Sequence, residues 1–218
     1  MVRMIAAAGL SLLMGVGAVH ASVLSDGSFE AGTPNPSWTE FSANFGTPLC
    51  TIANCGTGNG SGPRTGDWWA WFGGVQSAPE ASSLSQTVVL PTGSATLRFY
   101  FETPALSANP SDFIEARMNG TTVWSETAAT ATSGLGYSLV SVDISAYADG
   151  GSHTLSFFAE TTGNGVSNFF IDDVSIETAA VPLPPAALLL GGALLGGLGL
   201  ARRRPRPRSD HRAAENRA

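Results

Sequence analysis

The chain has 218 residues, a formal charge of −6 and no lysine. The acidic excess is concentrated between residues 22 and 180, where three arginines stand against fifteen acidic residues and the formal charge is −12. A segment of this charge repels nucleic acid and anionic lipid, so neither is expected as a partner. The absence of lysine excludes a phosphate-binding P-loop and Schiff-base chemistry.

The first 21 residues have the features of a secretory signal peptide. Arg3 supplies positive charge, residues 4–19 are mostly apolar, and the small residues Val19 and Ala21 precede Ser22. This pattern predicts export through the Sec translocon and cleavage by signal peptidase after Ala21. The exported ectodomain is then residues 22–180, which is the usual size of one domain.

The ectodomain sequence predicts strands and no helix. Residues 95–102 alternate between apolar and polar side chains, the period of a half-buried strand. Asn119-Gly120 predicts a hairpin turn between residues 112–118 and 121–125. Further strands are predicted at residues 68–72, 84–90, 137–144, 153–159 and 168–177. Short strands at regular spacing indicate an all-β sandwich.

Residues 47–65 are rich in Gly, Asn and Pro and are predicted to form a long loop. This loop contains Cys50 and Cys55, the only two cysteines of the chain. In an oxidising compartment they are expected to form a disulfide, and no histidine nearby supports a metal site instead.

The C-terminal segment predicts a membrane anchor. Residues 183–201 carry no charge and would span about 28 Å as a helix, close to the thickness of a bilayer. Arg202, Arg203 and Arg204 follow, which by the positive-inside rule places the C-terminus in the cytoplasm. A buried core helix is the alternative, but it leaves the arginine cluster without explanation. Residues 205–218 are then a disordered basic cytoplasmic tail.

The two ends together resemble the PEP-CTERM class of bacterial surface proteins. The resemblance rests on the signal peptide, on Val181, Pro182, Leu183 and Pro184 within a 181–204 sorting segment, and on the arginine cluster. Leu183 stands where the commonest motif has Glu, as in a V-P-L-P-A variant, with Pro185 inserted. The resemblance implies cleavage by an exosortase. It also implies a single-pass precursor in a Gram-negative inner membrane and a mature protein at the cell surface or in the exopolysaccharide matrix.

Three internal segments give a second resemblance. Asp26-Gly27-Ser28-Phe29-Glu30, residues 66–74 with three tryptophans, and Phe170-Ile171-Asp172-Asp173-Val174-Ser175 are similar to the galactose-binding-like jelly roll of carbohydrate-binding modules and MAM-type adhesion domains. In that family the first and last strands lie side by side, often with a structural calcium at their junction. The resemblance therefore implies a jelly-roll β-sandwich and a calcium site.

The resemblance assigns Glu30, Asp172 and Asp173 as calcium ligands, and carboxylate oxygens are the ligands that calcium prefers. Strict alternation along the last strand would put Phe170, Val174 and Ile176 on one face with Asp172, and Asp173 on the other. The alternative is that the two aspartates form an exposed pair that binds Arg64 or water.

The tryptophans are candidates for a sugar-stacking platform, because the C–H faces of pyranose rings pack on indole rings. We select Trp69, Trp71 and Trp124 as ligand-binding residues. Alternation in the strand puts Trp69 and Trp71 on one face and Trp68 on the other. One of these sets is expected in the core, which is the commoner place for tryptophan in a small sandwich.

An enzyme is not expected. His153 is the only histidine of the ectodomain, and neither a G-x-S-x-G nor an H-E-x-x-H motif is present. We predict an exported, non-catalytic, calcium-stabilised β-sandwich that binds extracellular polysaccharide. The alternatives are a structural or adhesive surface protein without a sugar ligand and, less favoured, a glycosidase with two carboxylates about 5 to 10 Å apart in a cleft.

Overall fold

The computed structural model of the chain describes residues 22–179. The predicted signal peptide, sorting motif, membrane helix, arginine cluster and tail lie outside these residues. Within residues 22–179, no helix has the length and apolar character needed to cross a membrane.

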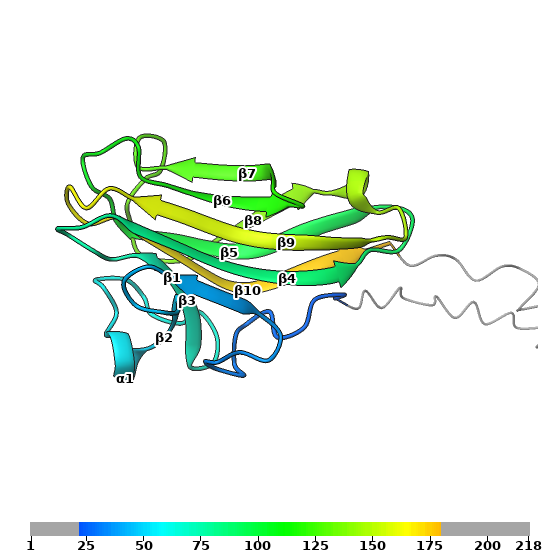
Figure 1. The fold of residues 1–218 in the computed structure, drawn as a ribbon, viewed down its shortest axis with the longest axis horizontal. Helices are drawn as coiled ribbons and strands as arrows, with labels where there is room; N and C mark the ends of the chain where they lie inside the picture. The colour runs from blue at the N-terminus through cyan, green and yellow to red at the C-terminus, as the bar shows by residue number, and fades with distance from the viewer. Residues whose placement is uncertain (1–21, 180–218) are drawn as a thin grey trace, which may run out of the picture. The chain divides into compact units, whose positions relative to one another are not determined.

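The described residues form two five-stranded sheets that pack face to face (Figure 1). All strand pairs are antiparallel. The first sheet has the order β1 (Thr39–Ser42), β4 (Glu80–Val89), β9 (Ser152–Thr161), β6 (Phe113–Met118), β7 (Thr121–Thr127). The second has the order β2 (Leu49–Thr51), β3 (Trp68–Gly73), β10 (Asn168–Thr178), β5 (Ala95–Ala105), β8 (Ser138–Asp143). The predicted all-β sandwich is confirmed.

The core lies between the two sheets and follows the period of two in the sequence. Leu97 and Phe99 of β5 and Leu155 and Phe157 of β9 are fully buried, while the residues between them are half-buried. Phe99 and Phe157 meet edge to face across the sandwich at 5.1 Å. Burial of each such side chain contributes about 2 to 3 kcal/mol, so these inward rows fix which face of each sheet is inside.

The hairpin between β6 and β7 turns at Asn119 and Gly120, as predicted. Both residues have positive φ angles, 51° and 81°. This is the backbone of the two-residue turn that suits the twist of antiparallel strands, and it explains why Asn-Gly stands there.

The last strand departs from the predicted alternation. Phe169 and Ile171 point into the core, but so do Val174 and Ile176. The register with β5 shifts between Asp172 and Ser175, and Asp173 has a φ of 49°. A β-bulge at Asp173 therefore adds one residue and reverses the facing of the positions after it.

The segment that carries the N-terminal motif is not a strand, although it lies beside β10. Residues 26–30 form turns, and the Val174 amide donates to the Gly27 carbonyl at 2.8 Å. A Cβ at Gly27 would lie 1.8 Å from the Val174 carbonyl oxygen. Only glycine allows this approach, so the start and the end of the domain meet here. The first strand β1, however, lies in the other sheet from β10, so the first and last strands are not side by side as the second resemblance implies.

The segment between β2 and β3 crosses the outer face of the second sheet. It begins with the one-turn helix α1 (Ile52–Cys55) and continues as the crossing loop, residues 56–67. The loop is held by side chains of the sheet beneath it: Ser61 N donates to Glu102 at 2.8 Å and Asn168 donates to the Gly58 carbonyl at 2.9 Å. A predicted long loop is thus largely confirmed, and it buries an outer-face cluster of Cys50, Trp69 and Phe170.

Candidate functional site

A hollow of about 490 Å³ opens beside β2 and β3, between α1 and the segment after β1. Its walls combine an aromatic ring, a disulfide and short polar side chains. The lining residues are Thr33, Phe45, Thr47, Leu49, Cys50, Asn54, Cys55, Trp71, Gly73 and Gly74.

Trp71 is the half-buried aromatic residue of this hollow, and its ring is held by Asn168 and Phe170. Its indole Nε1 donates to Asn168 Oδ1 at 3.0 Å, and Asn168 in turn holds the crossing loop at Gly58. The Phe170 ring meets it edge-on at 5.2 Å. At Gly74, φ is 85° and a Cβ would lie 3.1 Å from the indole nitrogen. The ring is therefore fixed in place before any ligand arrives, which lowers the entropy cost of binding.

The disulfide forms one wall of the hollow. Cys50 and Cys55 are bonded as predicted, with Cα atoms 5.8 Å apart. Thr51 caps the short helix by accepting from Asn54 N at 3.3 Å. The closed ring holds Asn54, whose amide is a donor and an acceptor, at the rim.

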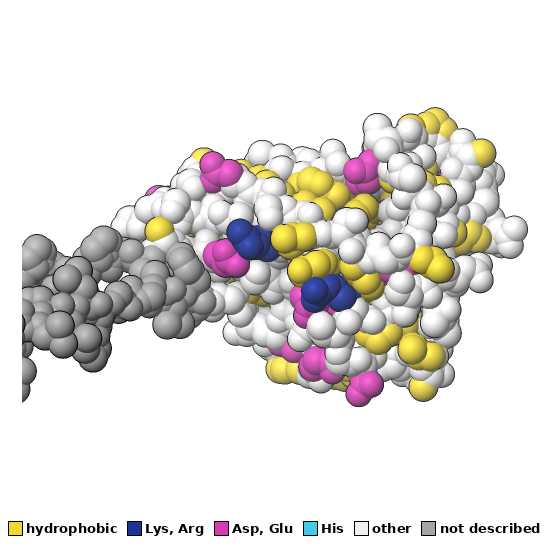
Figure 2. Space-filling view, turned by 180° about the vertical axis from the view of Figure 1, so that it is seen from behind, with side chains coloured by type: hydrophobic (Ala, Val, Ile, Leu, Met, Phe, Trp, Pro, Cys, Tyr) yellow, Lys and Arg dark blue, Asp and Glu magenta, His cyan; other side chains and the backbone are white. Residues whose placement is uncertain are grey.

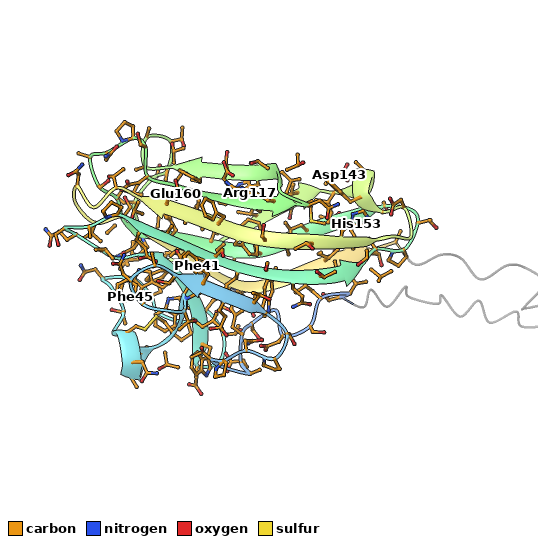
Figure 3. The ribbon with its side chains drawn as sticks, in the orientation of Figure 1. Phe41, Phe45, Arg117, Asp143, His153 and Glu160 are labelled. Atoms are coloured by element: carbon orange, nitrogen blue, oxygen red, sulfur yellow. A yellow bond between two sulfur atoms is a disulfide. The ribbon has the colours of Figure 1, made fainter. Side chains whose placement is uncertain are left out.

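Phe45 forms the opposite wall and is 60% exposed. Its backbone amide donates to Ser42 Oγ at 3.0 Å, and the hydroxyl of Ser42 donates to the buried Glu80 at 2.6 Å. Figure 3 shows Phe45 after β1, on the side of α1, whereas Phe41 projects from β1 itself. An exposed aromatic ring on an anchored backbone is the kind of residue that binds the apolar face of a ligand.

The hollow carries no formal charge. Within residues 22–179, none of its lining side chains is an acid, a base or a free thiol. Hydroxyls, an amide and backbone groups supply its polarity. Such a site suits an uncharged ligand with apolar faces and hydroxyl groups, and it holds neither a nucleophile with a base nor a facing carboxylate pair.

His153 lies elsewhere and is engaged in structure. Its Nε2 is 2.9 Å from Asp149 Oδ1 and its Nδ1 is 2.9 Å from the Asn119 amide nitrogen. Hydrogen bonds from His153 and Gly151 hold the pKa of Asp149 below its usual value. The geometry around His153 therefore ties the β6–β7 turn to β9.

The three predicted calcium ligands lie around residues 64–68. We call this segment, together with Glu30, Asp172 and Asp173, the acidic junction. Both oxygens of Glu30 accept from Asp67 N at 3.1 Å, and one also accepts from Trp68 N at 3.0 Å. Asp172 is fully buried. Its Oδ2 accepts from Arg64 N at 2.7 Å and Thr65 N at 3.1 Å, and its Oδ1 accepts from Asp173 N at 2.7 Å.

Asp173 forms an ion pair with Arg64 and accepts from Thr65 Oγ1 at 2.6 Å. The Arg64 guanidinium also lies over the Tyr100 ring, 3.3 Å from its centroid. The pairing of Asp173 with Arg64 agrees with the alternative hypothesis of an exposed aspartate pair that binds Arg64. Asp172 departs from that hypothesis because it is buried. Figure 2 shows a face on which basic side chains lie directly against acidic ones.

Burial and, to a smaller extent, the charge of Asp173 raise the pKa of Asp172 to about 7, against the lowering effect of the backbone amides of Thr65 and Arg64. Burial also raises the pKa of the Tyr137 hydroxyl, which donates to the Gly62 carbonyl at 2.7 Å. The Asp172 carboxyl and the Tyr137 hydroxyl therefore both bind the crossing loop from positions that are shielded from water.

In this arrangement the carboxylates of the acidic junction bind donors of the chain itself. Every carboxylate oxygen of Glu30, Asp172 and Asp173 already accepts from an N–H, an O–H or the guanidinium. Among residues 22–179, no group of three or more His, Cys, Asp or Glu side chains is placed to hold a metal. Calcium binding at these residues stays a prediction, and no step of our account depends on it.

The structure separates the three selected tryptophans. Trp69 and Trp71 share the outer face of β3 as predicted, while Trp68 packs against the core. Trp69 is fully buried, because the crossing loop covers that face, so its ring offers no surface to a ligand. Trp124 is half-buried and packs edge-on against Phe99 and Phe101, both at 5.0 Å, at the margin of the core. Of the three, only Trp71 reaches the hollow.

Phe45, Thr47 and Asn54 were not identified from the sequence. Phe45 lies in the irregular stretch after β1, which no strand pattern marks. The available signal was an aromatic residue next to Gly46 among short polar residues, where a core role is least expected.

Comparisons with known proteins give likenesses of fold. No protein-family model and no curated protein matches the chain, whereas 70 chains of solved structures do. A family 61 carbohydrate-binding module in complex with β-1,4-galactotriose is 18% identical, with a TM-score of 0.49 over 72% of this chain and 97% of that one. A Stig cyclase from Fischerella sp. TAU is 16% identical, with a TM-score of 0.47 over 75% and 100%. The K2 adhesin domain of Lys-gingipain is 12% identical, with a TM-score of 0.44 over 74% and 98%. These neighbours include binding modules and enzymes, and they do not identify the ligand of this chain.

Proposed function

We propose that this protein is an exported, non-catalytic module that binds an uncharged polysaccharide through the hollow of Phe45 and Trp71. The observation that carries the proposal is the pairing of a fixed, half-buried indole ring with an exposed phenyl ring around an uncharged lining. Sugars bind through C–H faces on aromatic rings and through hydroxyls that need donors and acceptors. Thr33, Thr47 and Asn54 supply both kinds of group.

The charge of the domain supports an uncharged ligand. Three arginines are distributed among fifteen acidic residues, and each forms an ion pair with an acid, namely Asp173, Glu177 or Glu115. No arginine lines the hollow. An anionic chain would meet repulsion without a compensating contact, which disfavours it as a ligand.

Placement at the cell surface or in the exopolysaccharide matrix is part of the same proposal. It rests on the sequence of the two ends, through the Sec signal and the exosortase motif. Anchoring by the 183–201 helix, or release after cleavage near Val181, would bring the module to the cell's own extracellular polysaccharide. Calcium is not needed for the binding that we propose.

The two alternatives are less well supported by the geometry. A glycosidase requires a facing pair of carboxylates, and the lining described above has none. A structural or adhesive role would use exposed apolar side chains such as Leu139 on the edge strand β8 and Leu135 before it, which are 49% and 73% exposed. Neither side chain lines the hollow, so substituting them tests an adhesive role without changing the proposed polysaccharide site.

The test is co-sedimentation of the purified protein with the extracellular polysaccharide of its host. We expect retention of the unmodified protein and at least a tenfold weaker apparent affinity for Trp71→Ala, since loss of an aromatic stacking face costs at least about 1.4 kcal/mol. The variant Leu139→Ala is the control and should be retained normally. Equal retention of the unmodified protein and Trp71→Ala, or loss of retention only in Leu139→Ala, would contradict the proposal.

A further inference from the structure

A second hollow of about 420 Å³ adjoins the first. The two hollows share Thr33, Phe45 and Thr47. The second is completed by Pro34, Asn35, Trp38, Glu40 and Gly46. The two hollows therefore adjoin at Phe45, and we call the pair the groove.

The second hollow differs from the first in carrying one carboxylate. Glu40 is half-buried on β1, with its Oε1 accepting from Asn35 N at 2.5 Å and its Oε2 accepting from Thr33 Oγ1 at 2.7 Å. A carboxylate has about four acceptor positions, so two contacts leave capacity for further donors. An ionised carboxylate accepts and never donates, which requires donors on any ligand bound there.

The scaffold of this hollow is rigid. Asn35 Oδ1 accepts from Ser37 N at 2.9 Å and Trp38 N at 3.1 Å, and its Nδ2 donates to Asp26 at 2.6 Å. The Trp38 indole donates to the Asp26 carbonyl at 2.9 Å. Glu40 is therefore held in place by a backbone that is itself fixed, and its free acceptor positions are available without rearrangement.

We infer that the two hollows are two subsites of one groove that binds consecutive units of a polysaccharide chain, with Glu40 accepting from hydroxyl donors of the unit in the second hollow. The inference rests on the proposed function and extends it to a ligand class: uncharged, hydroxyl-rich chains, bound along their length. Chains that carry uronic acid or sulfate at the second position are rejected, because they place an anion beside Glu40.

Chain length is the first test. Extracellular polysaccharide of the host is partly hydrolysed, separated by anion exchange into neutral and acidic fractions, and sized from one to six units. Isothermal titration calorimetry with the neutral oligomers should show affinity rising at least tenfold from one unit to two and then levelling off. Phe45→Ala should remove that rise. Phe41→Ala is the matched control, because Phe41 is also an exposed phenylalanine, 51% against 60%, but lines neither hollow.

The outcomes separate the two claims. Binding of single units as tightly as of longer chains overturns the two-subsite groove and leaves the proposed function standing. Absence of binding for every oligomer overturns both. A rise with chain length that survives Phe45→Ala shows that the additional units lie outside this groove and also overturns the inference.

The role of Glu40 is tested by charge selectivity. Glu40→Gln should weaken binding of the neutral tetramer about tenfold, while binding of a single unit, which needs only the first hollow, should change less than twofold. The control Glu160→Gln removes the same charge from an exposed position of β9 that lines neither hollow (Figure 3). Melting temperatures of both variants check that the fold is kept. Tighter binding of the acidic fraction than of the neutral one by the unmodified protein would overturn the assigned ligand class without any variant.

Discussion

The groove and the acidic junction lie at the two ends of β3, and they differ in whether their polar groups bind the chain itself or face open space. At the junction, every carboxylate oxygen of Glu30, Asp172 and Asp173 accepts from a donor of the chain. In the groove, hydroxyl and amide groups surround open space beside the exposed Phe45 and the half-buried Trp71. The first arrangement closes the domain, because it joins residues far apart in sequence. The second leaves interactions to be made by a ligand.

This contrast explains why the most acidic sequence motif is not our functional site. Paired aspartates near the end of a domain suggest a metal or a catalytic centre from the sequence alone. Their contacts show that they attach the crossing loop and the N-terminal turns to β10. Variants of the junction should therefore change stability and leave binding intact, whereas variants of the groove should do the reverse.

The largest stability effect is expected at Gly27, where the chain ends meet. Gly27→Ala would place a Cβ against the Val174 carbonyl oxygen, a backbone atom that cannot move aside. We expect a loss of roughly 3 kcal/mol or more in the free energy of unfolding, measured by urea denaturation, because the contact must be broken. The control Gly134→Ala has open space around the added Cβ and should lose much less. A Gly27→Ala protein of unchanged stability would contradict the close approach.

Removal of the disulfide should affect both properties. The double variant Cys50→Ala/Cys55→Ala loses the constraint of a short ring, worth about 2 kcal/mol. Because Asn54 is held by that ring, binding of the neutral tetramer should also weaken several-fold. Chemical denaturation and calorimetry on the same protein give the two numbers. Unchanged binding would show that Asn54 and the disulfide wall do not contact the ligand.

The pH dependence should report on Asp172. Its pKa in the folded protein is about 7, above the ordinary value of 3.8, because burial disfavours the ionised form. The folded state then holds a proton that the unfolded state has lost, so stability falls as pH rises from about 4 to 7. Asp112, Asp143 and Asp149 have lowered pKa values and contribute stability that is lost only at lower pH. We expect the melting temperature to fall between pH 5 and pH 7, and Asp172→Asn to flatten this slope. A slope that survives the substitution would assign the titration to another group.

The smallest effect is expected at Arg64, whose side chain is 32% exposed. Arg64→Met removes the ion pair with Asp173 and the contact with Tyr100, at a cost of about 1 kcal/mol after solvent screening.

A calcium titration of the same variant gives a second test. The melting temperature of the unmodified protein should not respond to calcium or chelator, because the Arg64 guanidinium competes with a cation for Asp173, whereas Arg64→Met removes this competitor and should gain a calcium response. A calcium response in the unmodified protein would instead support the ligand set that the family resemblance implies.

The sequence was informative where contacts are local. Period-two alternation found β5 and β9, and Asn119-Gly120 located the hairpin turn. β1 and β2 were missed because four and three residues give too short a pattern. β1 is held by the hydrogen bond from the Ser42 hydroxyl to the buried Glu80. β2 lies directly before the helix that the disulfide closes. The bulge at Asp173 depends on a positive φ angle that no alternation rule anticipates.

The same division applies to the candidate site. Alternation correctly placed Trp69 and Trp71 on one face of β3, but it could not show that the crossing loop buries one and leaves the other open. That outcome depends on partners about 100 residues away in sequence, such as Asn168. Phe45 was missed for a related reason: its exposure follows from the anchored backbone after β1, not from any periodic pattern.

The most direct test of the central claim is the response of the five tryptophan indole N–H signals to the neutral polysaccharide fraction in a nitrogen-15 NMR titration. Our account predicts a shift of the Trp71 signal that saturates with ligand, while the signals of the buried Trp69 and of Trp124 stay in place. Saturable shifts of Trp124 with an unmoved Trp71, or no shift of any indole signal, would contradict it.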